Sequence, residues 1–175
     1  MNVFLIAAIS VNGKIAQETN QSSLEWTSKE DTAFFIEKTK EIGTVIMGEK
    51  TFETIGKPFK GRRSIVLTQD VELMKQKYAE VNENETRLEF VKESPVDLIH
   101  RLESEGVSSV IIGGGSYVYS SFLREGLVTE LYLTVEPVLF GNGIPLASDF
   151  GDKKLSFVEM KLLGDQSVSL HYRLV

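Results

Sequence analysis

The chain has 175 residues, a formal net charge of −6 at pH 7 and no cysteine. The length predicts one domain over residues 1–175 with a sizeable core, and the acidic balance argues against nucleic acid as a general partner. The lack of cysteine excludes disulfides, thiol nucleophiles and Cys-based zinc sites, and it suits a reducing compartment such as the cytoplasm.

Residues 2–9 are apolar and predict a buried first strand. The segment has no basic leader and is too short to span a bilayer, so no membrane association is expected. Asn12 and Gly13 then turn the chain into a polar loop over residues 16–25. Loops of this kind often cover sites on rigid scaffolds.

A helix is predicted after Ser28, which is a good N-cap. Asp31 lies three residues on, where its carboxylate can reach back to the helix start. Gly43 ends the helix as an expected left-handed cap. The apolar residues that recur at helical spacing are Ala33, Phe35, Ile36 and Ile42.

Asp31 and Phe35 stand one above the other on this helix, at i and i+4. A carboxylate beside an aromatic ring suits a flat ligand with polar edges, which would hydrogen-bond at one end and stack on its face. Alternatively, Asp31 only caps the helix and Phe35 only fills the core. These two residues alone leave both interpretations open.

Residues 45–47 predict a buried strand, and residues 64–68 predict another. Between them, Thr51 is the expected cap of a short helix that Gly56 closes, and a turn covers residues 58–61. Beside this turn stands a basic cluster, which could hold a small anion or could be an ordinary solvated loop. Its members are Lys57, Lys60, Arg62 and Arg63.

The next segment alternates helices and strands up to a run of three glycines. The predicted elements are a weak helix over 71–80, a turn over 82–86, a strand over 88–91, a helix from Ser94-Pro95 to Glu105, a strand over 107–112 and a helix over 116–124. Strand, glycines and helix bring backbone N–H groups close to a phosphate. Gly113 to Gly115 fit neither a Walker loop nor G-x-G-x-x-G, because Val118 takes the last glycine position.

The end of the chain is β-only, with strands over 129–135, 155–163 and 167–174 and a hairpin turn at Gly164-Asp165. Predicted helices and strands alternate in the first part of the chain, and only strands are predicted at its end. This order predicts an α/β fold. The expected architecture is a mainly parallel central sheet flanked by helices, with an antiparallel C-terminal hairpin. Neither His100 nor His171 has metal-ligand spacing, so no metal site is expected.

Many separate positions agree in order with one family. Trp26, Asp31 and Phe35 are followed by VIMG at 45–48, TFETIG at 51–56, Pro58, GR at 61–62 and IVLT at 65–68. LIAA at 5–8, Val118-Tyr119 and LYLT at 131–134 continue the agreement. This order resembles dihydrofolate reductase over most of the chain and implies that family's fold.

Other segments are closer to the related riboflavin-pathway reductase domain, which uses the same fold and cofactor on a phosphorylated pyrimidine. They are SVNGKIA at 10–16, GGGS at 113–116 and PVLFG at 137–141. The segment over residues 15–26 is also longer than in dihydrofolate reductases and lacks the usual Pro before Trp26. Reduction of that pyrimidine, or nucleotide binding without turnover, therefore remains an alternative.

The resemblance implies NADPH-dependent reduction of dihydrofolate to tetrahydrofolate, by a monomer or a homodimer. Asp31, whose pKa burial should raise, would act with Thr134 and Trp26 at the reacting ring. Arg62 would pair with the substrate's carboxylate. The implied substrate contacts are Ile6, Ala8, Leu24, Asp31, Phe35, Ile55, Lys57, Arg62 and Thr134.

The resemblance also places the cofactor along the glycine turn, where the family has a cis peptide, here best matched to Gly114-Gly115. The implied cofactor contacts are Ala8, Ile15, Gly48, Lys50, Thr51, Thr68, Gln69, Gly113, Gly114, Gly115, Ser116, Tyr117, Val118 and Tyr119. Glu49 stands where many dihydrofolate reductases have an Arg that holds the NADPH 2′-phosphate. A carboxylate there makes NADH a possible second cofactor.

Overall fold

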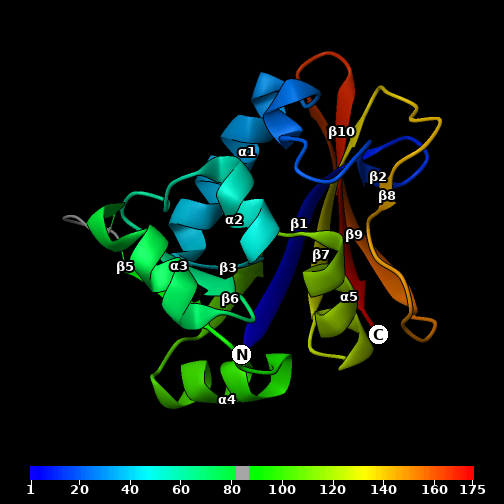
Figure 1. The fold of residues 1–175 in the computed structure, drawn as a ribbon. Coiled ribbons are helices and arrows are strands. Elements are labelled where there is room, and N and C mark those ends of the chain that lie inside the picture. The colour runs from blue at the N-terminus through cyan, green and yellow to red at the C-terminus, as the bar shows by residue number, and fades with distance from the viewer. Residues whose placement is uncertain (82–86) are drawn as a thin grey trace.

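The computed structural model describes residues 1–81 and 87–175. The turn predicted over residues 82–86 lies outside the described residues. One eight-stranded sheet runs through the molecule in the order β5-β4-β3-β6-β1-β7-β10-β9 (Figure 1). Its strands are β1 (Asn2–Ser10), β3 (Thr44–Gly48), β4 (Arg63–Leu67), β5 (Arg87–Val91), β6 (Ser109–Ile112), β7 (Glu130–Glu136), β9 (Leu155–Leu163) and β10 (Ser167–Leu174).

The pairing of these strands confirms the predicted architecture. From β5 to β7 all neighbours are parallel, whereas β10 runs antiparallel to both β7 and β9. The hairpin turns at Gly164, whose φ of 62° is a conformation that favours glycine. A second, two-stranded sheet joins β2 (Lys14–Ala16) to β8 (Ile144–Pro145).

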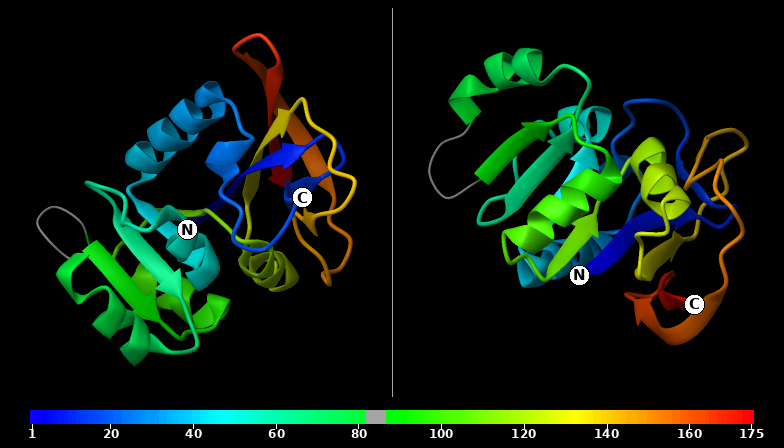
Figure 2. Two further views of the ribbon diagram at one scale, coloured as in Figure 1. Left: turned by 45° about the horizontal axis from the view of Figure 1, so that its top comes forward. Right: turned by 90° about the horizontal axis from the view of Figure 1, so that it is seen from below.

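Helices cover both faces of the large sheet (Figures 1 and 2). They are α1 (Lys29–Ile42), α2 (Glu49–Ile55), α3 (Val71–Lys77), α4 (Pro95–Ser104) and α5 (Ser116–Arg124), with short 3-10 turns at Ser23–Glu25 and Ala79–Val81. Leu98 of α4 and Phe122 of α5 belong to one core cluster, and Phe52 of α2 and Met74 of α3 belong to the other. Within the described residues, no helix is long and apolar enough to cross a membrane.

The ends of α1 and α4 follow their sequence signals. The Ser28 side chain accepts from the backbone N–H of Asp31, and Ser94 accepts in the same way from Asp97. Gly43 ends α1 with a φ of 82°, where a side chain would be strained. These capping predictions are confirmed.

The apolar residues that recur along α1 do not all face the core. Ala33 and Ile36 lie on the solvent side of α1, whereas the sheet side carries the buried Thr39 and the half-buried Phe34 and Phe35. Phe35 and Ile42 pack against the core. One capping prediction is wrong. The cap of α2 is Gly48 rather than Thr51, because β3 leads directly into the helix.

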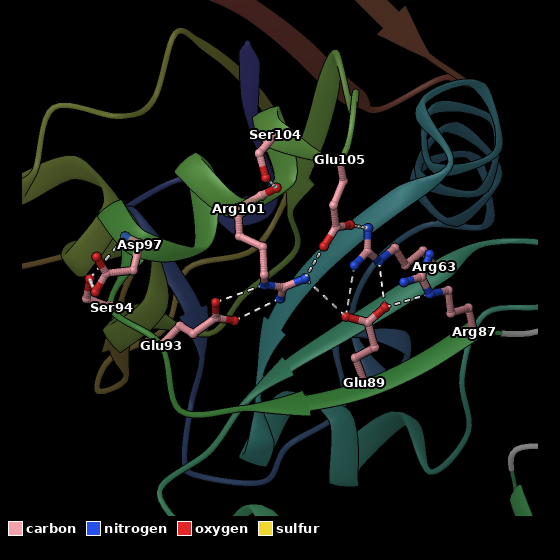
Figure 3. Close-up of polar contacts among 9 residues, drawn as sticks. All are labelled: Arg63, Arg87, Glu89, Glu93, Ser94, Asp97, Arg101, Ser104 and Glu105. Carbon is pink, nitrogen blue, oxygen red and sulfur yellow. Dashed lines mark hydrogen bonds and ion pairs between the residues drawn. The ribbon is translucent and has the colours of Figure 1, made fainter.

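Arg63 is not part of a surface anion site. It is 9% exposed at the start of β4, and its Nε lies 2.7 Å from Glu89 Oε1 while its Nη1 lies 2.5 Å from Glu105 Oε2. Arg101 of α4 also contacts Glu89 and Glu105, and it contacts Glu93 at 2.8 Å (Figure 3). These ion pairs tie β4 and β5 to α4.

Candidate active site

The start of α1 brings Asp31 against β7. The Asp31 carboxylate hydrogen-bonds to the side chain of Thr134, which is 1% exposed on that strand. The two residues are 103 positions apart in the chain, and only the sheet brings them together. The Asp31 side chain therefore contacts β7 rather than only the end of its own helix. The contact brings together two residues that were expected separately to belong to the site.

A second buried carboxylate supports this helix start from β7. Glu136 is 2% exposed, and its Oε1 accepts from the backbone N–H of Ser28 at 2.9 Å and from the Ser28 hydroxyl at 2.8 Å. Its Oε2 accepts from the Ser167 hydroxyl of β10 at 2.6 Å. The backbone N–H of Ser28 therefore pairs with Glu136, and the expectation that Asp31 reaches back to it is wrong.

Glu136 was not nominated from the sequence, although one signal pointed to it. It stands two residues after Thr134 in a β-rich run, and such a spacing places both side chains on one face of the strand. An acid on the buried face of a strand needs hydrogen-bond partners. The serine at the start of α1 supplies them.

The pKa of Asp31 is raised from 3.8 to about 6, as expected for a buried carboxyl. Burial is the main cause, and the negative charge of Glu136 raises the pKa further, whereas the hydrogen bond from Thr134 lowers it. A carboxyl that titrates close to neutral pH can hold a charge against a polar ring and respond to a proton on it.

Trp26 lies just before α1 and packs edge-on against Phe140, with ring centroids 5.1 Å apart. Its indole Nε1 and the neighbouring Thr27 Oγ1 are buried and have no hydrogen-bond partner among the described residues. Buried polar atoms in native proteins are nearly always satisfied by protein, water or ligand. These two atoms therefore mark a place that suits a polar ligand or an ordered water.

The expected apolar wall residues differ in their burial, and Ile6 and Phe35 belong to one apolar cluster. Ile6 is 4% exposed, and its carbonyl accepts from the hydroxyl of Tyr119 at 2.8 Å. Phe35 packs edge-on against Phe59 at 5.7 Å between ring centroids. Of the other expected wall residues, Ala8 is half-buried, whereas Leu24 and Ile55 are 69% and 37% exposed and so lie at the surface.

Arg62 lies beside these aromatic rings. Its guanidinium stands 4.7 Å from the centre of the Phe59 ring, and its Nη1 donates to Thr39 Oγ1 at 2.6 Å. Partial burial lowers the pKa of Arg62, but a guanidinium stays charged in proteins. Lys57 is exposed nearby in the chain. Of the four basic residues, Arg62, Lys57 and Lys60 therefore remain candidates for the predicted anion site, and Arg63 does not.

The glycine turn lies at the carboxyl ends of β3 and β6. The peptide between Gly114 and Gly115 is cis, which confirms the register implied by the resemblance. The backbone N–H of Gly48 donates to the Gly114 carbonyl at 2.8 Å. A Cβ at Gly48 would lie 3.0 Å from Val118 Cγ2, so a larger residue there would force Val118 to shift.

Two helices begin at this turn, α2 after Gly48 and α5 after Gly115. Neither start has a side-chain cap, so first-turn N–H groups of both helices are open to an anionic ligand. Thr51 of α2 packs closely against the glycine turn. A Cβ added at Gly115 would lie only 3.1 Å from Thr51 Oγ1. This cradle fits the diphosphate of a dinucleotide.

The remaining expected cofactor residues lie around these strand ends. Thr68 is buried and its hydroxyl donates to Glu49 Oε2, so Glu49 faces the segment that carries Gln69. Ser116 and Ile15 are half-buried, and Ile15 packs against the core. Lys50, Gln69 and Tyr117 are exposed. A separate hollow of about 580 Å³ lies against α3 and β5, and none of the nominated residues lines it.

Comparison with known proteins agrees with this arrangement. The family model described as dihydrofolate reductase matches residues 2–137. Over 96% of its length, the chain is 28% identical to the uncharacterized protein YwjB of Bacillus subtilis (strain 168), of which it covers 95%.

Two solved structures share the fold. A putative riboflavin biosynthesis protein from Shewanella sp. PV-4 superposes with a TM-score of 0.83 at 21% identity, over 100% of this chain and 99% of that one. Dihydrofolate reductase from Enterococcus faecalis, complexed with NADP(H) and RAB-propyl, superposes with a TM-score of 0.67 at 19% identity, over 99% and 96% of the two chains.

Proposed function

Because the chain belongs to the dihydrofolate reductase family, we propose that it reduces 7,8-dihydrofolate to 5,6,7,8-tetrahydrofolate with NADPH. The observation that carries the proposal is the Asp31 carboxylate, buried against Thr134, with a pKa raised to about 6. A charged group held in a water-poor site is well placed to bind and polarise a pterin ring.

In this proposal, the ring amino group and an adjacent ring N–H donate to Asp31. The carboxylate draws positive charge onto the ring and makes the imine nitrogen easier to protonate. Trp26 Nε1 and Thr27 Oγ1, which are buried without partners, order the water that delivers this proton. Phe35 and Ile6 cover the two faces of the ring and limit access of other water.

The cofactor supplies the hydride to the imine carbon, next to the nitrogen that takes the proton. The chain's contribution is to hold it. The starts of α2 and α5 at Gly48 and Gly115 would bind its diphosphate, and the segment from Thr68 to Gln69 would lie beside its adenosine ribose.

Arg62 would bind the glutamate α-carboxylate at the far end of the substrate. Its contacts with Phe59 and Thr39 fix the plane of the guanidinium and leave other N–H groups for a two-pronged carboxylate pair. The substrate would then extend from Asp31 past Phe35 to Arg62.

A second candidate is reduction of a phosphoribosylated pyrimidine, 5-amino-6-(5-phosphoribosylamino)uracil. The higher TM-score with the putative riboflavin biosynthesis protein favours it. That reaction has no evident use for a buried carboxylate beside Phe35, and it would need a phosphate site. Nucleotide binding without turnover is the remaining alternative.

The test is an absorbance assay of NADPH oxidation with purified protein and each of the two substrates in turn. The proposal predicts oxidation with dihydrofolate and little with the pyrimidine. The reverse preference would establish the second candidate, and cofactor binding without oxidation of NADPH by either substrate would indicate a binding protein.

A further inference from the structure

Among the described residues, β9 is the last strand at one end of the large sheet, and only its inner side pairs with another strand, β10 (Figure 2). Eight of its nine residues are exposed. Long, exposed and apolar edge strands are normally avoided in natural proteins because they invite pairing with another chain. Its exposed large apolar residues are Leu155 (44%), Phe157 (61%), Val158 (42%), Met160 (64%) and Leu162 (66%).

We propose that β9 pairs antiparallel with β9 of a second copy of this chain, about a two-fold axis at Met160, so that two sheets join into one. The occupant is a second copy because the strand is complementary to itself. Glu159 and Lys161 flank Met160 symmetrically, and the apolar residues Val158 and Leu162 flank them in turn.

The register follows from sheet geometry. Directly opposite residues of an antiparallel pair point to the same face, and faces alternate along each strand. A two-fold axis perpendicular to the sheet therefore passes through a residue and never between two residues. Three positions are available in the charged centre of β9, namely Glu159, Met160 and Lys161.

Only one of these three positions brings opposite charges together. An axis at Glu159 sets two carboxylates against each other, and an axis at Lys161 does the same with two ammonium groups. An axis at Met160 sets Glu159 opposite Lys161 of the second copy, twice by symmetry. Within one chain Lys161 Nζ already lies 3.3 Å from Glu159 Oε2, so both side chains are on one face.

The strand is regular over the three central positions of this pairing, Glu159, Met160 and Lys161. The register shift between β9 and β10 falls opposite His171 and Tyr172, next to Val158. From Glu159 to Leu163 the pairing with β10 is continuous. The two Glu159–Lys161 pairs of the proposed ladder therefore lie in the regular part of the strand, and the ladder reaches the irregular position where Leu162 of one copy meets Val158 of the other.

The test is the mass of the intact protein in solution, measured by light scattering and sedimentation, for charge variants of β9. The wild type should be a dimer. Lys161→Glu or Glu159→Lys each replaces two attractive pairs by two repulsive ones, which should raise the dimer dissociation constant at least about tenfold. The double variant Glu159→Lys/Lys161→Glu restores opposite charges and should restore the dimer.

Lys153→Glu is the matched control, because it makes the same charge change at an exposed residue just before β9 and should leave the dimer intact. Circular dichroism checks that every variant is folded. A monomeric wild type would overturn the proposal, and so would single variants that dimerise normally. Failure of the double variant to recover the dimer would also overturn it.

Discussion

At the scale of single residues, three charged side chains have contacts that separate their roles. Arg62 and Arg63 are adjacent, yet the first lies beside Phe59, whereas the second is itself buried and pairs with Glu89 and Glu105. The Glu49 carboxylate accepts from the hydroxyl of the buried Thr68. The role proposed for each of these side chains can be tested by a substitution.

Replacing Arg62 by Lys should raise the KM for dihydrofolate more than it lowers kcat. The contact lies far from the reacting ring and contributes equally to substrate and transition state. Lysine keeps the charge but cannot form a two-pronged pair. Steady-state kinetics with dihydrofolate and with a truncated substrate that lacks glutamate measure this effect. Equal losses with both substrates would exclude carboxylate pairing at Arg62.

Replacing Glu49 by Arg should widen the preference for NADPH over NADH, chiefly through a lower KM for NADPH. Where water screens the two charges, a carboxylate near a 2′-phosphate costs only about 1 kcal/mol, so the wild type should still prefer NADPH. The measurement is the ratio of kcat/KM for the two cofactors, at low and at high salt. Glu53→Arg, one turn further along α2, is the control. An unchanged ratio would show that residue 49 does not face the phosphate.

At the scale of elements, β7 contacts the start of α1 through Glu136. This carboxylate holds both polar groups of Ser28 and lies close enough to Asp31 to raise its pKa. Glu136→Gln keeps the shape of the side chain and removes the charge. We expect the acid limb of the kcat/KM profile, near pH 6 in the wild type, to move to lower pH.

The pH profile separates this role from a purely structural one. If Glu136 only braced the helix, the substitution would lower stability and leave the midpoint of the acid limb in place. Glu130→Gln, on the same strand but paired with His171, is the matched control and should not move the midpoint.

Elements with local signals could be predicted from the sequence, and contacts between distant segments could not. The helices α4 and α5 and the hairpin of β9 and β10 follow from Ser94-Pro95, the glycine turn and Gly164-Asp165. Asp31 and Thr134 were nominated because each matches a motif. Glu136 was missed because its partner Ser28 lies 108 residues away. The burial of Thr39 rather than Ala33 or Ile36 in α1 could not be predicted, because periodicity does not say which side of a helix meets the sheet.

At the scale of the whole molecule, ion pairs join the edge of the sheet to α4 (Figure 3). Arg63 and Arg101 lower the pKa of Glu105 from 4.5 to about 2. A depressed carboxyl pKa stabilises the fold above pH 4.5, and this stabilisation is lost as pH falls toward 2. The raised pKa of Asp31 acts in the opposite sense, because it costs stability as pH rises from about 4 to 6.

Arg63→Met should lower the free energy of unfolding at neutral pH by about 2 kcal/mol, because it leaves Glu89 and Glu105 without their buried partner. Urea unfolding measures the difference, which should shrink as pH falls from 4.5 toward 2. Arg87→Met removes an ion pair of Glu89 whose arginine side chain is 65% exposed, and it should cost less than about 1 kcal/mol. Equal effects of both substitutions would contradict a special role for Arg63.

The most direct test of the account is the single-turnover rate of hydride transfer to dihydrofolate in the wild type and in Asp31→Asn, at neutral pH. Asparagine can keep the hydrogen bond with Thr134 but cannot carry the charge that polarises the pterin. We predict a fall of at least about a hundredfold in a folded protein. A rate close to that of the wild type would contradict the central claim that Asp31 is the catalytic carboxylate.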